Sequence, residues 1–487
     1  MRIFYALLLL PAILTGQVLP DQIWVAGTHD LPGQPGYGNA IIRFQGEQVL
    51  ISTTNLGMNF ESTVAVMPDT IGNILFYTNG CYIANSVGDT MFNGTNLNPG
   101  EMADWTCPTS GYAAPLGAMA LSLPGSSHLY YLFHMGVRYS PENKLSYGPF
   151  YYSIIDMEKE GGKGAVISKN NILAEGQFEP FTAVRHGNGR DWWLVFPEYG
   201  TNKYQWILFS ATGVQQIYHQ EIGGALSCRY IGSSAFSPNG TRYARQQHCG
   251  VVVMDIDRCS GLFSNPRSIA MPPRAILGGG VAFSEDGNKL LVATQLSIQQ
   301  ADLTLQNPVL DTIVPSIDIA GTSLLLMQYT SNGKIYLNSL GRTEAFHVIH
   351  TPNEHEIGFE QRGLSLPVYS IRSLPNYPNY RLYDLPESNC DTLGINAPMV
   401  STTTIPPPIE ISVSPNPFSE EIKIQMSSGF QSSVFCLFDQ VGRLVLSKDL
   451  VNVTTEITGF NLPAGVYFWE IKSKREIIKS GKLIRFW

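Results

Sequence analysis

Short apolar and aromatic runs that follow turn signals recur along most of the chain. Gly72-Asn73 precedes Ile74-Leu75-Phe76-Tyr77, and Glu285-Asp286-Gly287 precedes Leu290-Leu291-Val292-Ala293. Gly, Asn and Asp readily adopt the backbone angles of tight hairpin turns, and runs this short with no helical period favour strands. Each motif therefore predicts a turn between two strands.

The turn motifs repeat at a long period. Their marker glycines are spaced by roughly 46 to 64 residues, close to the 40–50 residues of a four-stranded propeller blade. The markers are Gly72, Gly125, Gly189, Gly240, Gly287 and Gly333. These six units, with a seventh blade made jointly by Ile23 to Thr53 and Leu364 to Leu374, predict a seven-bladed β-propeller that one terminus closes. Two consecutive β-sandwiches are the alternative, although their turns would recur every 8–12 residues or so.

The pattern changes near residue 400. Ser401 to Pro408 is polar and rich in Pro and Thr, which is typical of an extended linker. From Ile409 onward apolar residues alternate with polar ones, as in Ile422 and Ile424 and again in Val434, Cys436 and Phe438. A period of two predicts strands of a small Ig-like β-sandwich, with Cys436 in its core. The chain is thus expected to be all-β.

The N-terminus has the pattern of a signal peptide. Met1 and Arg2 precede an apolar run from Ile3 to Leu14, which is too short to span a bilayer, and small residues follow it. No later run is long and apolar enough to span a membrane. The predicted organisation is a signal peptide at 1–17, a propeller at 18–395, a linker at 396–408 and a sandwich at 409–487.

Composition limits the possible partners. The formal net charge is -8 and only 14% of residues are charged. Binding to nucleic acid requires clustered Lys and Arg that release counterions from the phosphates, so nucleic acid is not an expected partner. Export permits disulfides, and seven cysteines leave at least one thiol unpaired. Cys81 with Cys107, or Cys249 with Cys259, are possible pairs that sequence alone does not decide.

The last 80 or so residues resemble the type A sorting domain of type IX secretion. Four motifs carry the resemblance: Val413 to Phe418, Leu437 to Arg443, Leu462 to Phe468, and Gly481 to Ile484. The final Arg485-Phe486-Trp487 is more aromatic than the family's usual ending. Residues Tyr152 to Met157 and Arg185 to Trp193 also resemble propeller modules of large exported proteins, which mostly lack an assigned activity.

The resemblance implies a route and a partner. It implies passage through the periplasm, recognition by the outer-membrane translocon and sorting machinery, and a secreted or surface location. The sorting-signal residues it implies are Pro415, Asn416, Pro417, Asp439, Gly442, Arg443, Gly465, Val466, Tyr467, Gly481, Lys482, Leu483 and Ile484. Gly481 to Ile484 are expected to matter most for recognition.

Catalytic and metal-binding patterns are weak. His347, His350 and His355 lack diagnostic spacing, and Asp255 and Asp257 lack the oxygen-rich loop that calcium requires, so no metal or cofactor is expected. A glycosidase needs only two carboxylates at a suitable separation. The first candidates are Glu179, Asp191 and Glu198, which lie in the most aromatic region of the sequence. No catalytic residue is assigned.

Two functions remain open for the propeller. The stretches 100–117 and 139–151 carry Trp105, Tyr112, Tyr139 and Tyr147, whose aromatic rings are suited to stack on a glycan or to contact a protein partner. A binding or interaction module is the favoured hypothesis, and a secreted glycan-active enzyme, a hydrolase or lyase, is the alternative. A deep pocket with two carboxylates would favour the enzyme, and a shallow aromatic surface would favour binding.

Overall fold

The computed structural model contains two compact units, residues 1–397 and 398–487. It describes residues 18–29, 31, 33–139, 145–227, 232–271, 279–315, 323–395, 411–426, 433–450, 452, 454–473 and 476–486. The predicted signal peptide at 1–17 and linker at 396–408 lie outside these residues. Within the described part, no helix has the length and apolar character needed to cross a bilayer.

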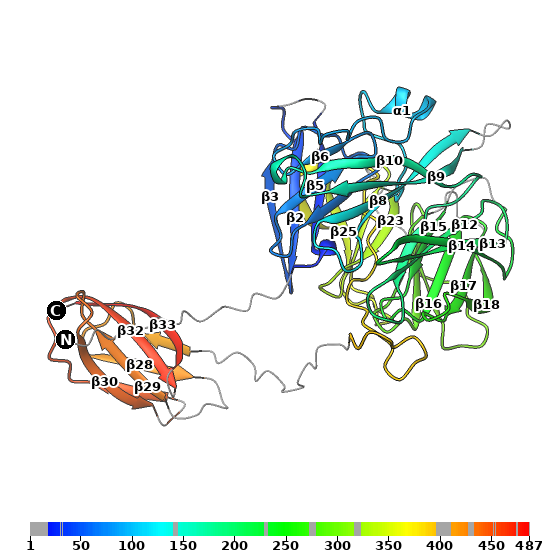
Figure 1. Cartoon of the computed structure of the whole chain (residues 1–487). Coiled ribbons are helices and arrows are strands. Elements are labelled where there is room, and N and C mark those ends of the chain that lie inside the picture. Colours follow the sequence, from blue (N-terminus) through cyan, green and yellow to red (C-terminus); the bar gives the residue numbers. More distant parts are fainter. Residues whose placement is uncertain are drawn as a thin grey trace. The chain divides into compact units, whose positions relative to one another are not determined.

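Seven antiparallel sheets form the larger unit (Figure 1). After the 3-10 turn η1 (Pro20–Gln22), the first sheet contains β1 (Ile23–Thr28), β2 (Gly38–Gln45) and β3 (Gln48–Thr54), and the second contains β4 (Ala65–Pro68), β5 (Ile74–Thr78) and β6 (Ile83–Asn85). The helix α1 (Glu101–Thr106) precedes a third sheet of β7 (Ala118–Ser122), β8 (Leu129–Tyr139), β9 (Leu145–Asp156) and β10 (Ala165–Ala174), with η2 (Glu160–Gly162) before β10.

The remaining four sheets of this unit each have four strands in sequence order. They contain β11 (Thr182–Arg185), β12 (Trp192–Pro197), β13 (Lys203–Ser210) and β14 (Gly213–Glu221); β15 (Ser233–Phe236), β16 (Arg242–Gln247), β17 (Gly250–Ile256) and β18 (Phe263–Ala270); β19 (Val281–Phe283), β20 (Lys289–Ala293), β21 (Ile298–Asp302) and β22 (Asp311–Val314); and β23 (Leu324–Tyr329), β24 (Ile335–Ser339), β25 (Thr343–Ile349) and β26 (Phe359–Ser370). This is the predicted all-β propeller.

The six marker glycines lie where the sequence predicted them. Each follows the first strand of a sheet, precedes the second, and has a positive φ between 70° and 90°. A side chain other than Gly is strained in that conformation, which explains why the turn motif recurs with a glycine.

The expected composition of the closing blade is confirmed only in part. Residues 23–54 form a sheet of their own, and Leu364 belongs to β26 and pairs with Phe346 of β25. Further along β26, however, Val368 forms a parallel bridge with Gly36, and the Tyr369 amide donates to the Gly36 carbonyl at 2.7 Å. The end of β26 therefore bonds both to β25 and to the chain just before β2.

Hydrogen bonds fix the direction of β1 relative to β4. Phe60, before β4, donates to the carbonyl of Gly27 at the end of β1, and Val18, before β1, donates to Thr70 after β4. Thus β1 runs opposite to β4.

The segment 371–385 fills the centre of the ring. The Asn376 side-chain amide donates to the carbonyls of Leu116 and Phe181, each at 2.8 Å, and these residues precede β7 and β11. The Tyr377 hydroxyl lies 2.8 Å from the carbonyl of Val66 in β4 and 3.1 Å from that of Ile23 in β1. One segment therefore bonds to strands of several sheets and closes the ring.

Disulfides hold two loops of the propeller. Cys81 is bonded to Cys107, and Cys259 is bonded to Cys390, which lies 131 residues further along the chain. Cys249 is also disulfide-bonded, but not to Cys259, so that possible pair does not form, whereas the possible pair of Cys81 and Cys107 does. Extracellular export is compatible with this oxidised state.

The smaller unit is a sandwich of two sheets, in agreement with the predicted Ig-like class. One sheet contains β27 (Ile411–Ser414), β28 (Glu421–Met426) and β31 (Thr454–Thr458), and the other contains β30 (Leu444–Leu450), β29 (Ser433–Phe438), β32 (Gly465–Ser473) and β33 (Glu476–Arg485), each in this spatial order. The core between them includes Ile422, Ile424, Phe435, Leu437, Ile471 and Leu483.

The core position of Cys436 was predicted incorrectly. In β29 the buried positions are Ser433, Phe435 and Leu437, so Val434, Cys436 and Phe438 are only partly buried on the opposite face. Both faces of this strand carry apolar side chains, and alternation alone does not tell which set is inside. Cys436 has a free thiol.

Candidate functional site

A cleft of about 540 Å³ lies in the propeller between α1 and the strands β8 and β9. Figure 1 shows α1 at one edge of the larger unit. The cleft is lined mainly by Glu101, Met102, Trp105, Tyr112, Arg138, Pro149 and Tyr151. It combines apolar rings with two side chains of opposite charge.

The helix α1 presents Trp105 to solvent. Gly100, with a φ of 135°, begins the helix, and the disulfide at Cys107 fixes its end to Cys81. Met102 is buried whereas Trp105 is 70% exposed. The short helix therefore needs covalent support to hold a solvated indole beside the cleft, because six residues are too few for a stable isolated helix.

Tyr112 and Arg138 lie in the cleft lining beyond α1. The Tyr112 ring is 2% exposed, and its hydroxyl accepts a 2.7 Å hydrogen bond from the Val137 backbone amide. Burial raises the pKa of Tyr112 to about 12, so the hydroxyl remains protonated at neutral pH. The Arg138 side chain is more than half exposed and lies 3.6 Å from a Glu175 carboxylate oxygen, an exposed pair that leaves the guanidinium accessible.

The four aromatic candidates separate in the structure. Trp105 and Tyr112 line the same cleft. Tyr147 is buried, and its hydroxyl donates to the carbonyl of Pro115 at 2.8 Å, so its ring packs inside the protein. Tyr139 ends β8, and its side chain lies outside the described part. Sequence reasoning missed Arg138, because it selected aromatic residues and not the charged residue beside Tyr139.

Glu179 is held in a buried ion pair. Arg245 donates to both of its carboxylate oxygens, at 2.9 and 2.5 Å, and Gln247 donates to it as well. Burial raises the pKa of Glu179, while the guanidinium of Arg245 acts to lower it. Arg245 also donates to the Thr201 carbonyl at 2.6 Å. The geometry joins β16 to the chain before β11 and leaves this carboxylate no open face for a substrate.

The other two carboxylate candidates are also engaged. Asp191 accepts from Arg190 at 2.7 Å, and Glu198 accepts from the Gln205 amide at 2.7 Å. Neither they nor Glu179 line the cleft. The sequence grouped these residues because they share an aromatic region. The segments of Glu179 and Glu198 do lie side by side, since Phe178 bridges Glu198 and Arg245 donates to the Glu179 carboxylate and to the Glu198 carbonyl at 3.2 Å, but both carboxylates are already hydrogen-bonded within the propeller.

The three histidines near residue 350 do not form a group with each other. His347 is buried, with Nε2 3.0 Å from the Ser339 hydroxyl, and burial lowers its pKa to about 4. His350 instead pairs with Glu360 at 2.9 Å, and His355 is exposed.

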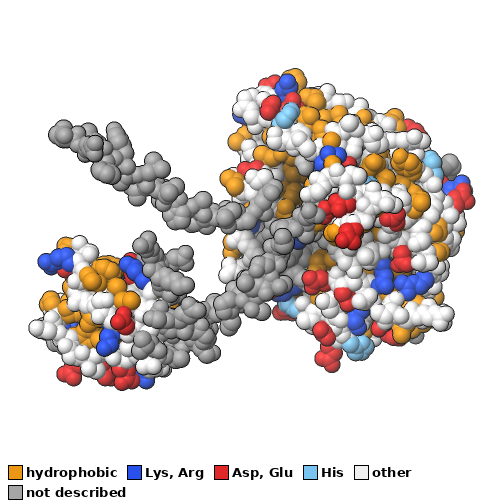
Figure 2. Space-filling model, turned by 60° about the horizontal axis from the view of Figure 1, so that its bottom comes forward, with side chains coloured by type: hydrophobic (Ala, Val, Ile, Leu, Met, Phe, Trp, Pro, Cys, Tyr) orange, Lys and Arg blue, Asp and Glu red, His pale blue; other side chains and the backbone are white. Residues whose placement is uncertain are grey.

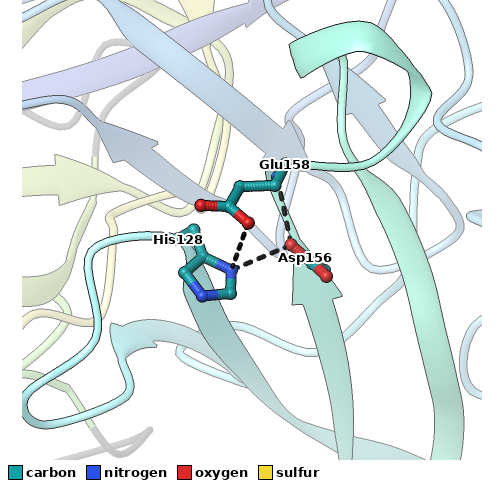
Figure 3. Close-up of side chains that lie close together, drawn as sticks. All are labelled: His128, Asp156 and Glu158. Carbon is teal, nitrogen blue, oxygen red and sulfur yellow. Dashed lines mark hydrogen bonds and ion pairs between the residues drawn. The ribbon is translucent and has the colours of Figure 1, made fainter.

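His128, Asp156 and Glu158 form a surface cluster that sequence reasoning did not identify (Figure 3). The Nδ1 atom of His128 lies 3.0 Å from Asp156 and 3.9 Å from Glu158, and Lys159 lies 3.8 Å from Asp156. The hydrogen bond from His128 lowers the pKa of Asp156. The nearby ammonium group already supplies positive charge, so this arrangement fits a hydrogen-bonded hairpin end.

A second cavity, of about 430 Å³, lies against the segment that fills the ring. Two carboxylates, Asp21 and Glu285, line it together with Tyr329 and Arg381. Asp21 is ion-paired with Arg381. Burial raises the pKa of Asp21, and Arg381 acts to lower it.

The predicted sorting residues near each end of the smaller unit meet in space. The Asn416 amide donates to the Lys482 carbonyl at 2.8 Å and accepts from the Ile484 amide at 2.9 Å. Pro415 and Pro417 flank this Asn in the segment before β28. Motifs separated by more than 60 residues are therefore one hydrogen-bonded unit.

The middle sorting residues shape turns and the core. Asp439 accepts from the backbone and the guanidinium of Arg443 across a turn in which Gly442 has a φ of 80°. The Tyr467 hydroxyl donates to the Pro463 carbonyl at 2.6 Å, two residues before Gly465. Val466 is partly buried.

Among the family models, a match covers only the smaller unit. The family model for the secretion system C-terminal sorting domain matches residues 412–485. No curated protein sequence matches the chain.

Solved structures with a similar arrangement are distant in sequence. A putative 6-phosphogluconolactonase from Bacteroides uniformis is 14% identical, with 72% of this chain and 98% of that chain covered and a TM-score of 0.41. PorZ, a surface component of the type IX secretion system of Porphyromonas gingivalis, is 10% identical, with 95% of this chain and 70% of that chain covered and a TM-score of 0.31. The Dos1 propeller is 12% identical, with coverages of 65% and 87% and a TM-score of 0.37.

Proposed function

Because the chain carries a type IX secretion sorting domain, which implies export to the outer membrane or cell surface, we propose that its propeller is a binding module for a glycan outside the cell. The observation that supports this proposal is the cleft beside α1, where a solvated indole lies near an accessible guanidinium. A protein ligand is the other binding partner that such a surface fits.

The chemistry of the cleft suits a sugar ring. The flat face of Trp105 offers apolar area to the C–H groups of a sugar, and Arg138 and Glu101 offer a donor and an acceptor to its hydroxyls. Glu101 is the only carboxylate among the described residues that line the cleft. Glycoside hydrolysis usually requires a pair of carboxylates, so this described lining favours binding over cleavage.

Glycan-array binding by the purified full-length protein, with Trp105→Ala as the variant, tests this proposal. We expect the variant to bind about thirtyfold more weakly, a loss of about 2 kcal/mol, because a central Trp often dominates such a contact. Its fold should be retained, since the indole is exposed. Phe92→Ala is the matched control, because Phe92 is 64% exposed and lies outside the cleft lining. Equal binding by the Trp105 variant and the wild type would contradict the proposal.

The enzyme alternative rests on the second cavity, which has two carboxylates in its lining. A hydrolysis panel on the same glycans, with Glu285→Gln as the variant, distinguishes the two functions. Glycan cleavage that this substitution abolishes would favour the enzyme and place the activity at the ring centre. Binding without cleavage would favour the cleft.

A further inference from the structure

The two outer faces of the sorting domain differ sharply in polarity. On the three-stranded sheet, the outward side chains of β28 and β31 are polar, and Lys423 pairs with Glu456 at 3.2 Å. The remaining outward positions of this sheet are Ser412, Ser414, Glu421, Gln425, Thr454 and Thr458. This is the ordinary composition of a sheet face in contact with water.

The outer face of the four-stranded sheet is apolar at one end. Phe438 of β29 pairs with Leu444 of β30 and with Phe468 of β32, so these three side chains form a row across three strands. Leu444 is 55% exposed and Phe468 is 48% exposed. Val466 and Ile484 pair in the adjoining row, and this set of five residues is the apolar outer face.

The same sorting motifs contribute both to the core and to this face. Leu483 and Tyr467 are buried inside the sandwich, whereas their neighbours Lys482 and Phe468 point outward and are exposed. Export machinery that recognises a folded domain can contact only the surface of that domain. The outward half of each motif is therefore available for recognition, and the inward half holds the fold.

We infer that the apolar outer face is the surface through which the export machinery binds the sorting domain. Contiguous exposed apolar area is characteristic of protein interaction sites, and the opposite outer face shows that the sandwich itself does not require it. The four strands of this face all lie within the segment that matches the sorting-domain family.

The border of the face indicates the chemistry of the partner. Lys482 pairs with Phe468 across the sheet, and the Lys472 ammonium lies 5.6 Å from the Phe438 ring centroid. The Arg443 side chain is exposed in the turn before β30. Figure 2 shows hydrophobic side chains on the visible surface of the smaller unit, with Lys and Arg side chains near them. Lys472 is paired with Glu470 and Arg443 with Asp439, each at 2.7 Å, so Lys482 is the border cation to which a partner carboxylate would be complementary. The complementary surface is thus apolar at its centre and carries a carboxylate opposite Lys482.

Export of the full-length chain in its natural host tests this surface, with Phe468→Ser as the main variant. We expect the protein to accumulate in the periplasm in a protease-resistant form, with about tenfold less outside the cell, because loss of a large ring at an interface centre weakens binding strongly. Thr458→Ala, on the polar outer face, should be exported like the wild type. Wild-type export of Phe468→Ser would overturn the inference.

A charge reversal covers the case in which Phe468→Ser disturbs folding. The Lys482 side chain is exposed, and the contact with Asn416 is made by the backbone carbonyl of Lys482, so Lys482→Glu leaves packing intact. We expect reduced export of a stable protein because carboxylates of the partner would repel the new charge. Export at the wild-type level by this variant would exclude the charged border.

The protein that binds the apolar outer face is identified by a photocrosslinking amino acid placed at position 468. A crosslink to a component of the outer-membrane export machinery supports the inference, and crosslinks confined to the propeller or to a second copy of the chain would overturn it. A chain that lacks residues 410–487 supplies the fully retained reference. Normal export of that truncated chain would disprove the sorting role itself, and this outcome is independent of glycan binding by the propeller.

Discussion

His134 shows how individual polar residues are accommodated in this propeller. Its ring is fully buried in β8, with Nδ1 2.7 Å from the Asn98 side-chain oxygen and Nε2 3.0 Å from the Ser153 hydroxyl. Burial lowers the pKa of His134 to about 3, because a charged imidazole would lose its hydration there. The side chain thus serves the fold as a neutral hydrogen-bonding group.

This burial predicts a loss of stability in acid. The unfolded chain binds a proton at His134 below about pH 6.5, whereas the folded protein does so only near pH 3. The stability contribution is therefore complete above about pH 6.5 and falls by about 1.4 kcal/mol per pH unit below it. Urea unfolding at several pH values should show a smaller pH dependence for His134→Gln. His355→Gln, at an exposed site, should resemble the wild type, and equal slopes for all three proteins would refute the prediction.

At the scale of elements, the last strand illustrates how one position combines packing with sorting. Gly481 of β33 faces Trp469 of β32, and a Cβ atom at this position would lie 2.7 Å from the indole. The absent side chain lets the indole lie flat against the strand in the sandwich core. Packing against Trp469 therefore explains why a glycine stands at this position of the terminal sorting motif, without any direct contact to the export machinery.

Gly481→Ala should destabilise the sorting domain. Overpacking of this kind typically costs about 1–3 kcal/mol, because the indole or the strand must move. Hydrogen exchange of the full-length protein should show faster exchange of the β32 and β33 amides, with little change in the propeller. Ser480→Ala, next to it on the exposed face, is the control. Unchanged exchange in Gly481→Ala would show that the sheet accommodates the methyl group.

At the scale of the whole propeller, closure depends on contacts between distant parts of the chain. The segment 371–385 bonds through Asn376 and Tyr377 to residues in the first half of the propeller. Just after this segment, the disulfide between Cys259 and Cys390 anchors the chain. Acidic and basic side chains are interspersed on the visible surface of this unit (Figure 2). The ring is held at its centre by the hydrogen bonds of this segment and by the disulfide between Cys259 and Cys390.

Loss of that link should weaken the ring. Cys390→Ser opens a loop of 131 residues, and removal of a disulfide of this kind costs about 2–4 kcal/mol through the entropy of the unfolded chain. Thermal melting of the full-length protein should show a lower midpoint for the propeller. Cys436→Ser, which removes the free thiol of the sorting domain, should leave that midpoint unchanged. A propeller that melts normally in Cys390→Ser would mean that the bonds of Asn376 and Tyr377 suffice.

The sequence alone determined the all-β class, the repeat and the sorting domain, because these depend on local signals. A turn glycine such as Gly240 and an alternating strand such as β28 act within a few residues, where composition and spacing suffice. The four sorting motifs likewise lie in order along the chain, and the family match confirms the sorting domain that they predicted.

Only the tertiary structure decided which residues meet. It placed Trp105 beside Arg138, paired Glu179 with Arg245, and turned Phe435 inward and Cys436 outward. Alternation fixes two faces of a strand but not which one is buried, because that choice depends on the sheet packed against it. Partners far apart in the sequence, such as Cys259 and Cys390, which are 131 residues apart, are chosen by the closed ring and leave no local trace in the sequence.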